Sequence, residues 1–193
     1  MKVLVIRAHP LDESFNFAVL QATLRGLEKA GHEVTLIDLN KDNFDPRLTA
    51  EERRTYHDHA YIPPDLERYV EQIRSHDAMV YVFPTWCFGV PAILKGFFDR
   101  VFRPGVAFDI DGAVVTPLFS NIKKIAGVST YGRARWMAIG MGDPPRTQIV
   151  KYVKWFCSKG CKTEYIAHYH MNASTEASRA TFLAKVDARM ARF

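Results

Sequence analysis

The sequence predicts an α/β fold of the doubly wound type, in which helices cover both faces of a parallel sheet. Short runs of aliphatic and β-branched residues alternate with longer segments whose apolar residues recur at helical spacing. The short runs are apolar almost throughout, as expected for strands that are buried on both faces. With 193 residues, 48% of them hydrophobic, the chain is long enough for a full core, and we expect one domain spanning residues 1–193.

Five segments have the composition of buried strands. The first, KVLVIRA, is an almost continuous aliphatic run, and AMVYVFP in the middle of the chain has the same character. The five predicted strands are residues 2–8, 33–39, 78–84, 123–130 and 162–169.

Five further segments have helical patterns. After the first strand, Phe17, Leu20 and Leu24 recur at helical spacing, and Gly31 ends that helix. Pro91 fits the first turn of the third helix. The predicted helices are residues 15–31, 65–76, 91–102, 146–160 and 175–193. Five strands alternating with helices fit the flavodoxin-like sheet, with strand order 2-1-3-4-5.

Two segments fall outside this alternation. Residues 43–64 form a long insertion after the second strand, and residues 103–121 are expected to form a loop or a hairpin. Within the insertion, EERR at 51–54 is expected to be a solvated helix face. Three aromatic residues of the fourth helix have helical spacing and are expected in the core, namely Tyr152, Trp155 and Phe156.

Composition excludes several classes of function. The net charge is +5, but the basic residues are scattered and no nucleic-acid-binding motif is present, so we expect no nucleic acid partner. No apolar run is long enough to span a bilayer, and the N-terminal segment does not have the pattern of a signal peptide, so we expect a soluble, cytoplasmic protein without membrane insertion. Cys157 and Cys161 are expected to be buried thiols, and no metal site is expected.

In such a sheet, ligands bind beyond the carboxyl ends of the strands. The first loop there, residues 8–16, opens a helix and therefore favours an anion. His9 can donate to a phosphate, while Ser14 and Asn16 add short hydrogen-bonding side chains. Alternatively, Ser14 is only a helix cap and His9 only packs. Neither G-x-G-x-x-G nor a P-loop occurs in the chain.

The second loop, PTWCFGVP, carries large apolar residues where turns usually carry small polar ones. Trp86, Cys87 and Phe88 would suit a planar aromatic ligand, and Gly89 would permit close approach of the backbone. Alternatively, the two rings only cover the end of the sheet.

The third loop, residues 129–136, contains Ser129, Thr130, Tyr131 and Gly132, which could hydrogen-bond the other edge of a flat ligand, and Trp136, which could form part of a lid. Alternatively, it is only a glycine-containing strand exit. One loop suits phosphate and two suit a flat ring, a combination that favours a flavin nucleotide.

AHPLDESFN and FPTWCFGVPAILKGFFDRVF resemble the NAD(P)H:quinone oxidoreductases of the DT-diaphorase type, from Met1 to about Ser129. The resemblance implies a homodimer with flavin at the subunit interface. It also implies a ping-pong cycle in which NAD(P)H gives two electrons to the flavin and a quinone removes them. The resemblance implies that the flavin phosphates and ribityl chain are held by His9, Ser14, Phe15 and Asn16. It implies that the isoalloxazine is lined by Pro84, Thr85, Trp86, Cys87 and Phe88, and that its pyrimidine side is reached by Ser129, Thr130, Tyr131 and Gly132. Phe108 of the partner would cover the substrate pocket, and Trp136, from the third loop, is our second candidate substrate residue.

The chain departs from the family at the residues that handle protons. Tyr131 stands where the mammalian enzymes have a glycine, and it is our candidate catalytic residue. His168 and His170 are expected beyond the fifth strand and outside this role. Arg133 or Arg135 could meet the phosphate of NADPH. The length of the first loop favours FAD, and the short insertion leaves FMN as the alternative.

Other functions remain open. A flavodoxin-like electron carrier or a regulatory ancillary subunit would share the fold, although electron carriers tend to be acidic and this chain is basic. An enzyme of the same class could instead reduce an azo dye, a nitroaromatic compound or free flavin.

Overall fold

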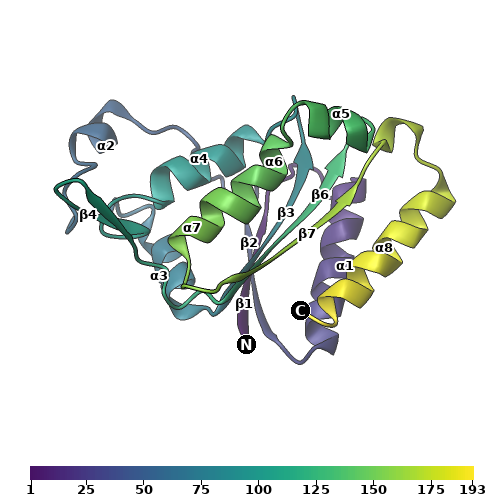
Figure 1. Ribbon diagram of the computed structural model, residues 1–193, viewed down its shortest axis with the longest axis horizontal. Helices are drawn as coiled ribbons and strands as arrows, with labels where there is room; N and C mark the ends of the chain where they lie inside the picture. Colours follow the sequence, from purple (N-terminus) through teal and green to yellow (C-terminus); the bar gives the residue numbers. More distant parts are fainter.

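The computed structural model describes residues 1–193 and contains a five-stranded parallel sheet (Figure 1). The strands are β1 (Lys2–Arg7), β2 (Glu33–Asp38), β3 (Ala78–Thr85), β6 (Lys124–Tyr131) and β7 (Lys162–His168), in the order β2-β1-β3-β6-β7. Counted along the sheet strands alone, this is the predicted order 2-1-3-4-5, so the fold class is confirmed. Almost every residue of β3 and β6 is buried, which explains their unbroken apolar runs.

Helices cover both faces of the sheet. On one face lie α1 (Phe15–Lys29) and α8 (Glu176–Met190). On the other lie α3 (Glu67–Ser75), α4 (Ala92–Val101) and the helical stretch from residue 144 to 156. The first pair packs closely, because a Cβ built on Gly26 would lie 2.5 Å from the Cβ of Met190.

The predicted helix at 146–160 ends earlier than expected. It consists of α6 (Pro144–Thr147), the π-helical turn η1 (Gln148–Val153) and α7 (Lys154–Phe156). Cys157 is extended and bridges to Phe119, whose N–H donates to the Phe156 carbonyl. Two short helices follow β6 and β7, namely α5 (Arg135–Gly140) and η2 (Met171–Ala173).

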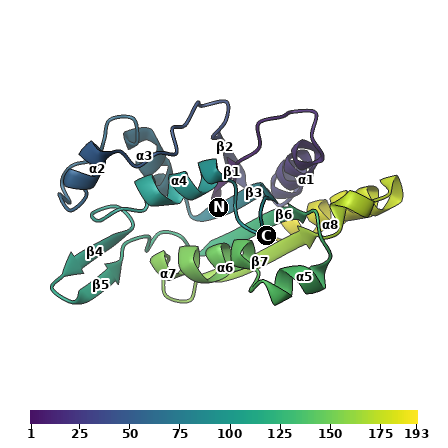
Figure 2. The ribbon, with the colours of Figure 1, turned by 90° about the horizontal axis from the view of Figure 1, so that it is seen from above.

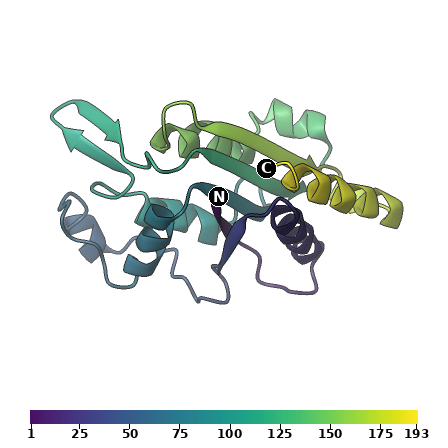
Figure 3. The same ribbon diagram turned by 90° about the horizontal axis from the view of Figure 1, so that it is seen from below.

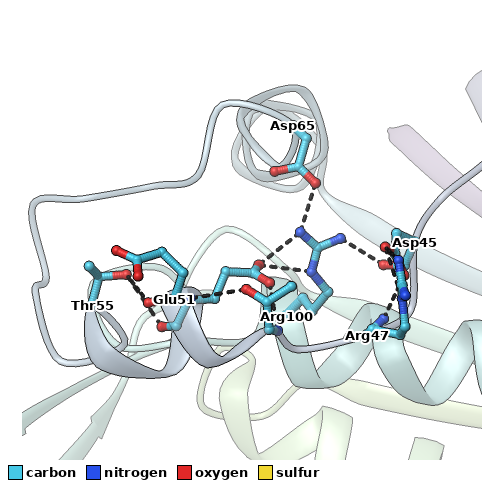
Figure 4. A network of polar contacts seen from close by, with 8 residues as sticks. Asp45, Arg47, Glu51, Thr55, Asp65 and Arg100 are labelled. Atoms are coloured by element: carbon cyan, nitrogen blue, oxygen red, sulfur yellow. Dashed lines mark hydrogen bonds and ion pairs between the residues drawn. The ribbon is translucent and has the colours of Figure 1, made fainter.

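The insertion at 43–64 contains α2 (Ala50–Arg54) and is held against α4 by Arg100. The guanidinium of Arg100 donates to Glu52, to the Asp45 carbonyl and to Asp65 at 2.6–2.8 Å (Figure 4). Glu52 is therefore buried, and the expectation that EERR is a solvated face is wrong at this position. The remaining residues of EERR are exposed.

Residues 103–121 form the predicted hairpin, with β4 (Phe108–Asp111) paired antiparallel to β5 (Val114–Pro117). The hairpin projects from one end of the molecule, beside α7 (Figures 2 and 3). Its tip exposes apolar side chains, with Val114 64% exposed. None of the helices has the length and apolar character needed to cross a bilayer.

Candidate functional site

The first loop is organised by Arg7, the last residue of β1. Its side chain is 1% exposed and donates to Asp12, Asp38 and the Leu11 carbonyl at 2.6–2.7 Å. An arginine buried this way needs such partners. Arg7 therefore fixes the path of the loop that leads into α1. This role was not predicted from the sequence, although an arginine at the end of an apolar strand could have indicated it.

His9 presents a donor beside the second loop. Its Nδ1 accepts the N–H of Leu11, which leaves the proton on Nε2. Burial, and then the charge of Arg7, lower the pKa of His9, so the ring is neutral near pH 7. The ring lies 5.9 Å from that of Trp86. The first two predicted loops therefore meet.

Ser14 is the N-cap of α1. Its hydroxyl donates to the Leu11 carbonyl and accepts the Phe17 N–H. The cap function is thus present, while a contact of Ser14 with flavin stays a prediction.

Asn16, in the first turn of α1, is 3% exposed, and neither its Oδ1 nor its Nδ2 has a hydrogen-bond partner. A buried amide without partners is costly and rare. It is satisfied when a ligand supplies the missing donor and acceptor. The same loop contains Phe15, whose ring packs on His168 at 5.9 Å.

The second loop is a strained two-residue turn. Trp86 and Gly89 exchange both backbone hydrogen bonds, at 3.1 and 2.8 Å. Cys87 and Phe88 between them have φ of 49° and 57°, as in a type I′ turn. Such positions favour Asn and Gly, and a left-handed non-glycine residue costs about 1–2 kcal/mol. Gly89, which was expected to permit close approach of the backbone, does not have a positive φ, and Cys87 and Phe88 carry the strain.

The third loop joins the second at the end of the sheet. The Oγ1 of Thr85 lies 3.1 Å from the Oγ of Ser129. Beyond these residues is a cavity of about 230 Å³, whose lining brings together Thr85, Cys87, Phe88, Tyr131, Gly132, Arg133 and Asn172. Pro84 and Thr130, paired in the sheet just below, are both buried. Asn172 belongs to η2, and nothing in the sequence distinguished it.

Tyr131 directs its hydroxyl away from free solvent. The hydroxyl donates to the Asp143 carboxylate and shares a second hydrogen bond with the Tyr165 hydroxyl, both at 2.6 Å. Burial, followed by Tyr165 and Asp143, raises the pKa of Tyr131 far above its usual value. The side chain therefore stays protonated at physiological pH.

Two predicted substrate residues lie outside this cavity. Phe108 packs against Phe156 at 5.7 Å and lines a separate groove of about 520 Å³. Trp136, on α5, is 74% exposed. Within one chain neither reaches the cavity, and their roles stay predictions.

Residues that line the groove beside Phe108 were expected in the core. Tyr152 and Trp155 are 58% and 48% exposed and line the groove, so they are not core residues. Phe156 is partly buried against the core. The side of the helix that faces the sheet is formed by Ile149 and Val153, which are fully buried.

The position expected for His168 also needs a correction, whereas His170 lies beyond β7 as expected. His168 is the last residue of β7, not a residue beyond it. Its ring packs against Phe15 and Phe182, and its Nδ1 is buried without a partner. Burial lowers the pKa of His168. It therefore belongs to the same end of the sheet as the first loop. No three His, Cys, Asp or Glu side chains converge in an arrangement that could hold a metal ion.

Known proteins resemble the chain at the level of both sequence and structure. Residues 1–191 match a family model described as "Flavodoxin-like fold". NAD(P)H dehydrogenase [quinone] 1 of Cavia porcellus is 31% identical over 68% of this chain and 54% of its own length. The chain thus spans about half the length of this curated relative.

Solved structures cover the chain more fully. An NAD(P)H:quinone oxidoreductase from Methanothermobacter marburgensis has a TM-score of 0.83 and 26% identity, covering 99% of this chain and 98% of its own. An FMN-dependent NADH-azoreductase from Bacillus anthracis, in complex with FMN, shares the fold with a TM-score of 0.74 and 15% identity, over 99% and 98% of the two chains. This chain belongs to the flavodoxin-like fold family, among relatives that include NAD(P)H dehydrogenases [quinone].

Proposed function

We propose that the protein is a flavin-dependent NAD(P)H:quinone oxidoreductase. The observation that carries this proposal is Asn16, a buried amide with no partner on either polar atom. It lies at the end of the sheet where the strained Cys87–Phe88 turn is also found. Unsatisfied and strained groups persist where a ligand or reaction requires them. Their position favours a ligand held by the first and second loops together.

The residues present fit a flavin nucleotide. The N-terminus of α1 and the Nε2–H of His9 offer donors to a phosphate. Trp86 and Phe88 offer aromatic walls, and the backbone between them offers hydrogen-bonding groups to a ring edge. Bound there, a flavin would supply the hydride chemistry by which two electrons pass from NAD(P)H to a quinone in a ping-pong cycle. The chain's own residues bind it, orient it and exclude water.

Tyr131 remains our candidate catalytic residue, and its hydrogen bonds limit what it can do. Its hydroxyl proton is already shared with the Asp143 carboxylate. Loss of that proton would leave a phenolate beside a carboxylate, which the high pKa of Tyr131 opposes. We therefore propose that Tyr131 acts through its ring, as a fixed wall of the cavity, rather than as a base or as a donor to the ligand.

A homodimer would complete the site. The cavity of about 230 Å³ is smaller than the pockets of about 300–1,000 Å³ that enclose small ligands. The hairpin and the groove beside it expose Val114, Tyr152 and Trp155 on one end of the molecule. We propose that a second copy covers this end and brings Phe108 over the flavin. Sedimentation of Trp155→Glu should give monomers, whereas Leu36→Glu, which changes an exposed residue at the other edge of the sheet, should stay dimeric.

The first experiment identifies the cofactor. The purified protein is denatured and the released flavin is measured by mass, which separates FAD from FMN. The length of the first loop favours FAD, whereas the azoreductase from Bacillus anthracis is named as a complex with FMN. If the protein takes up neither flavin after incubation, the proposal is wrong.

The second experiment measures turnover with NADH or NADPH and a benzoquinone. Trp86→Ala should lower flavin affinity and turnover, while Leu36→Ala, of similar exposure, should change neither. A flavin-loaded protein that never oxidises NAD(P)H would instead favour an electron carrier or a regulatory subunit. Faster turnover with azo or nitro compounds or free flavin would change the acceptor and keep the enzyme class.

A further inference from the structure

A second cavity lies at the open edge of the sheet, beside β7. It has a volume of about 370 Å³ and is lined by Arg135, Arg146, Tyr165, Ala167, Tyr169 and Lys185. Its three cations come from α5, α6 and α8, of which α5 and α8 lie on either side of the carboxyl end of β7 in Figure 1. Three separate elements therefore direct positive charge at one place.

None of these cations is held in an ion pair by the chain. Arg135, Arg146 and Lys185 form no ion pair with any carboxylate. Asp143 lies near Tyr169 together with Arg135 and Arg146, and it accepts the Tyr131 hydroxyl. It keeps its single negative charge, which leaves the three cations with a net positive charge. Unpaired positive groups around a cavity attract an anion.

The lining also supplies neutral donors. The hydroxyl of Tyr169 makes no hydrogen bond within the chain, and burial, followed by Asp143, keeps its pKa above the usual value despite both arginines. Two planar guanidinium groups can each bind phosphate oxygens in pairs, and an ammonium adds a third charge. This donor set matches a dianion better than a single carboxylate.

We propose that this pocket binds the phosphate monoester of a small molecule, and that its source is the 2′-phosphate of NADPH. Tyr131 lines the cavity at the proposed flavin site and contacts two lining residues of this pocket. Its ring packs on that of Tyr169 at 4.6 Å, and its hydroxyl bonds that of Tyr165. The assignment to NADPH rests on the proposed function, whereas the phosphate site itself does not.

The first test compares the two nicotinamide donors with flavin-loaded enzyme. The double variant Arg135→Ala/Arg146→Ala should lower kcat/KM for NADPH at least about tenfold and leave that for NADH unchanged. The control Lys151→Ala/Lys159→Ala removes the same charge from surface lysines beyond the opposite end of β7 and should preserve the NADPH preference.

The second test needs no flavin and no turnover. Calorimetric titration should show that adenosine 2′-monophosphate binds the wild type at least about tenfold more tightly than adenosine does, and that the double variant loses this difference. Circular dichroism verifies that the variants are folded, as expected for exposed side chains. This test judges the pocket even if the protein proves to have no NAD(P)H activity.

The outcomes separate the alternatives. Loss of both preferences supports NADPH as the source. Loss of phosphate binding with an unchanged NADPH preference assigns the pocket to a free phosphorylated metabolite and overturns the NADPH assignment. If both properties are unchanged, the pocket is not a phosphate site, and the cations serve only to protect the edge strand from pairing.

Discussion

Replacing Asn16 by leucine should affect stability and ligand binding in opposite directions. The amide is 3% exposed and has no partner for its Oδ1 or its Nδ2. Leucine removes both polar atoms and fills the space with methyl groups. A protein that kept Asn16 for its fold would be damaged by this change, whereas one that keeps it for a ligand would not.

The magnitude follows from the missing hydrogen bonds. A buried polar group left unpaired costs about 1–3 kcal/mol, and replacing it by an apolar group of similar shape is neutral or stabilising. We expect Asn16→Leu to raise the free energy of unfolding of the flavin-free protein by about 1 kcal/mol, or about 2–4 °C in Tm for a chain of this size. Loss of the amide should weaken flavin binding at least about tenfold.

The assay pairs urea unfolding of the flavin-free protein with a flavin fluorescence titration. Thr23→Ala is a matched control on α1, since its buried hydroxyl donates to the Val19 carbonyl at 2.9 Å. It should destabilise by about 1 kcal/mol without changing flavin affinity. A destabilised flavin-free Asn16→Leu, or an unchanged flavin affinity, would refute the reasoning.

Three further changes test strain, charge and packing. Phe88→Gly should stabilise the flavin-free protein by about 1 kcal/mol in urea unfolding, because glycine adopts the left-handed backbone freely. Lower stability would show that the Phe88 ring contributes more than the strain costs. Arg100→Met should cost about 3 kcal/mol at pH 7, since it leaves Glu52 buried without its cation. Burial opposes ionisation of Glu52, but the Thr49 N–H and Arg100 hold its pKa below the usual value, so this stabilisation is complete above the ordinary glutamate pKa and disappears as the pH falls through the lowered one. An equal loss at pH 7 and in strong acid would contradict this. Gly96→Ala should destabilise by about 1–3 kcal/mol, because a Cβ there would lie 2.2 Å from the Pro46 carbonyl oxygen. Gly140→Ala, with open space around it, is the control in thermal unfolding.

The fold could be predicted because its signals are local. Strands buried on both faces are apolar throughout, and the helices that separate them carry their own spacing and end signals. The predicted strands of the sheet agree with the observed ones to within one or two residues, as in residues 2–8 against Lys2–Arg7. The predicted end of the 146–160 helix was wrong, because Cys157 pairs with Phe119, which is far away in the sequence.

Burial of individual side chains was harder to predict. Glu52 is buried by Arg100, which lies 48 residues further along the chain. Tyr152 and Trp155 have the spacing of a core face, yet the sheet meets Ile149 and Val153 instead. Periodicity identifies an apolar side of a helix, but it does not say whether that side meets the same chain or another molecule.

In the candidate site, too, the positions of the loops could be predicted from the sequence, but the environment of individual residues could not. The three loops could be placed from topology alone, because carboxyl ends of parallel strands meet at one edge. The left-handed turn was not foreseen, since Cys-Phe has none of the residues that favour such a turn. Neither was the orphaned amide of Asn16, because hydrogen-bond satisfaction depends on the whole surrounding structure.

Residues that the fold alone would not favour at their positions are informative about function when they lie close together. A chain free of functional constraint would place glycine or asparagine in the turn at residues 87 and 88, an apolar residue at position 16 and acids beside Arg135 and Arg146. Each choice would be about neutral or better for the fold. Instead the turn, the amide and the unpaired cations all lie toward the carboxyl edge of one sheet, where this topology places ligands. We infer that a ligand extending along this edge would account for all three, although such conflicts are not confined to it, since the buried Nε of Arg103 also has no partner.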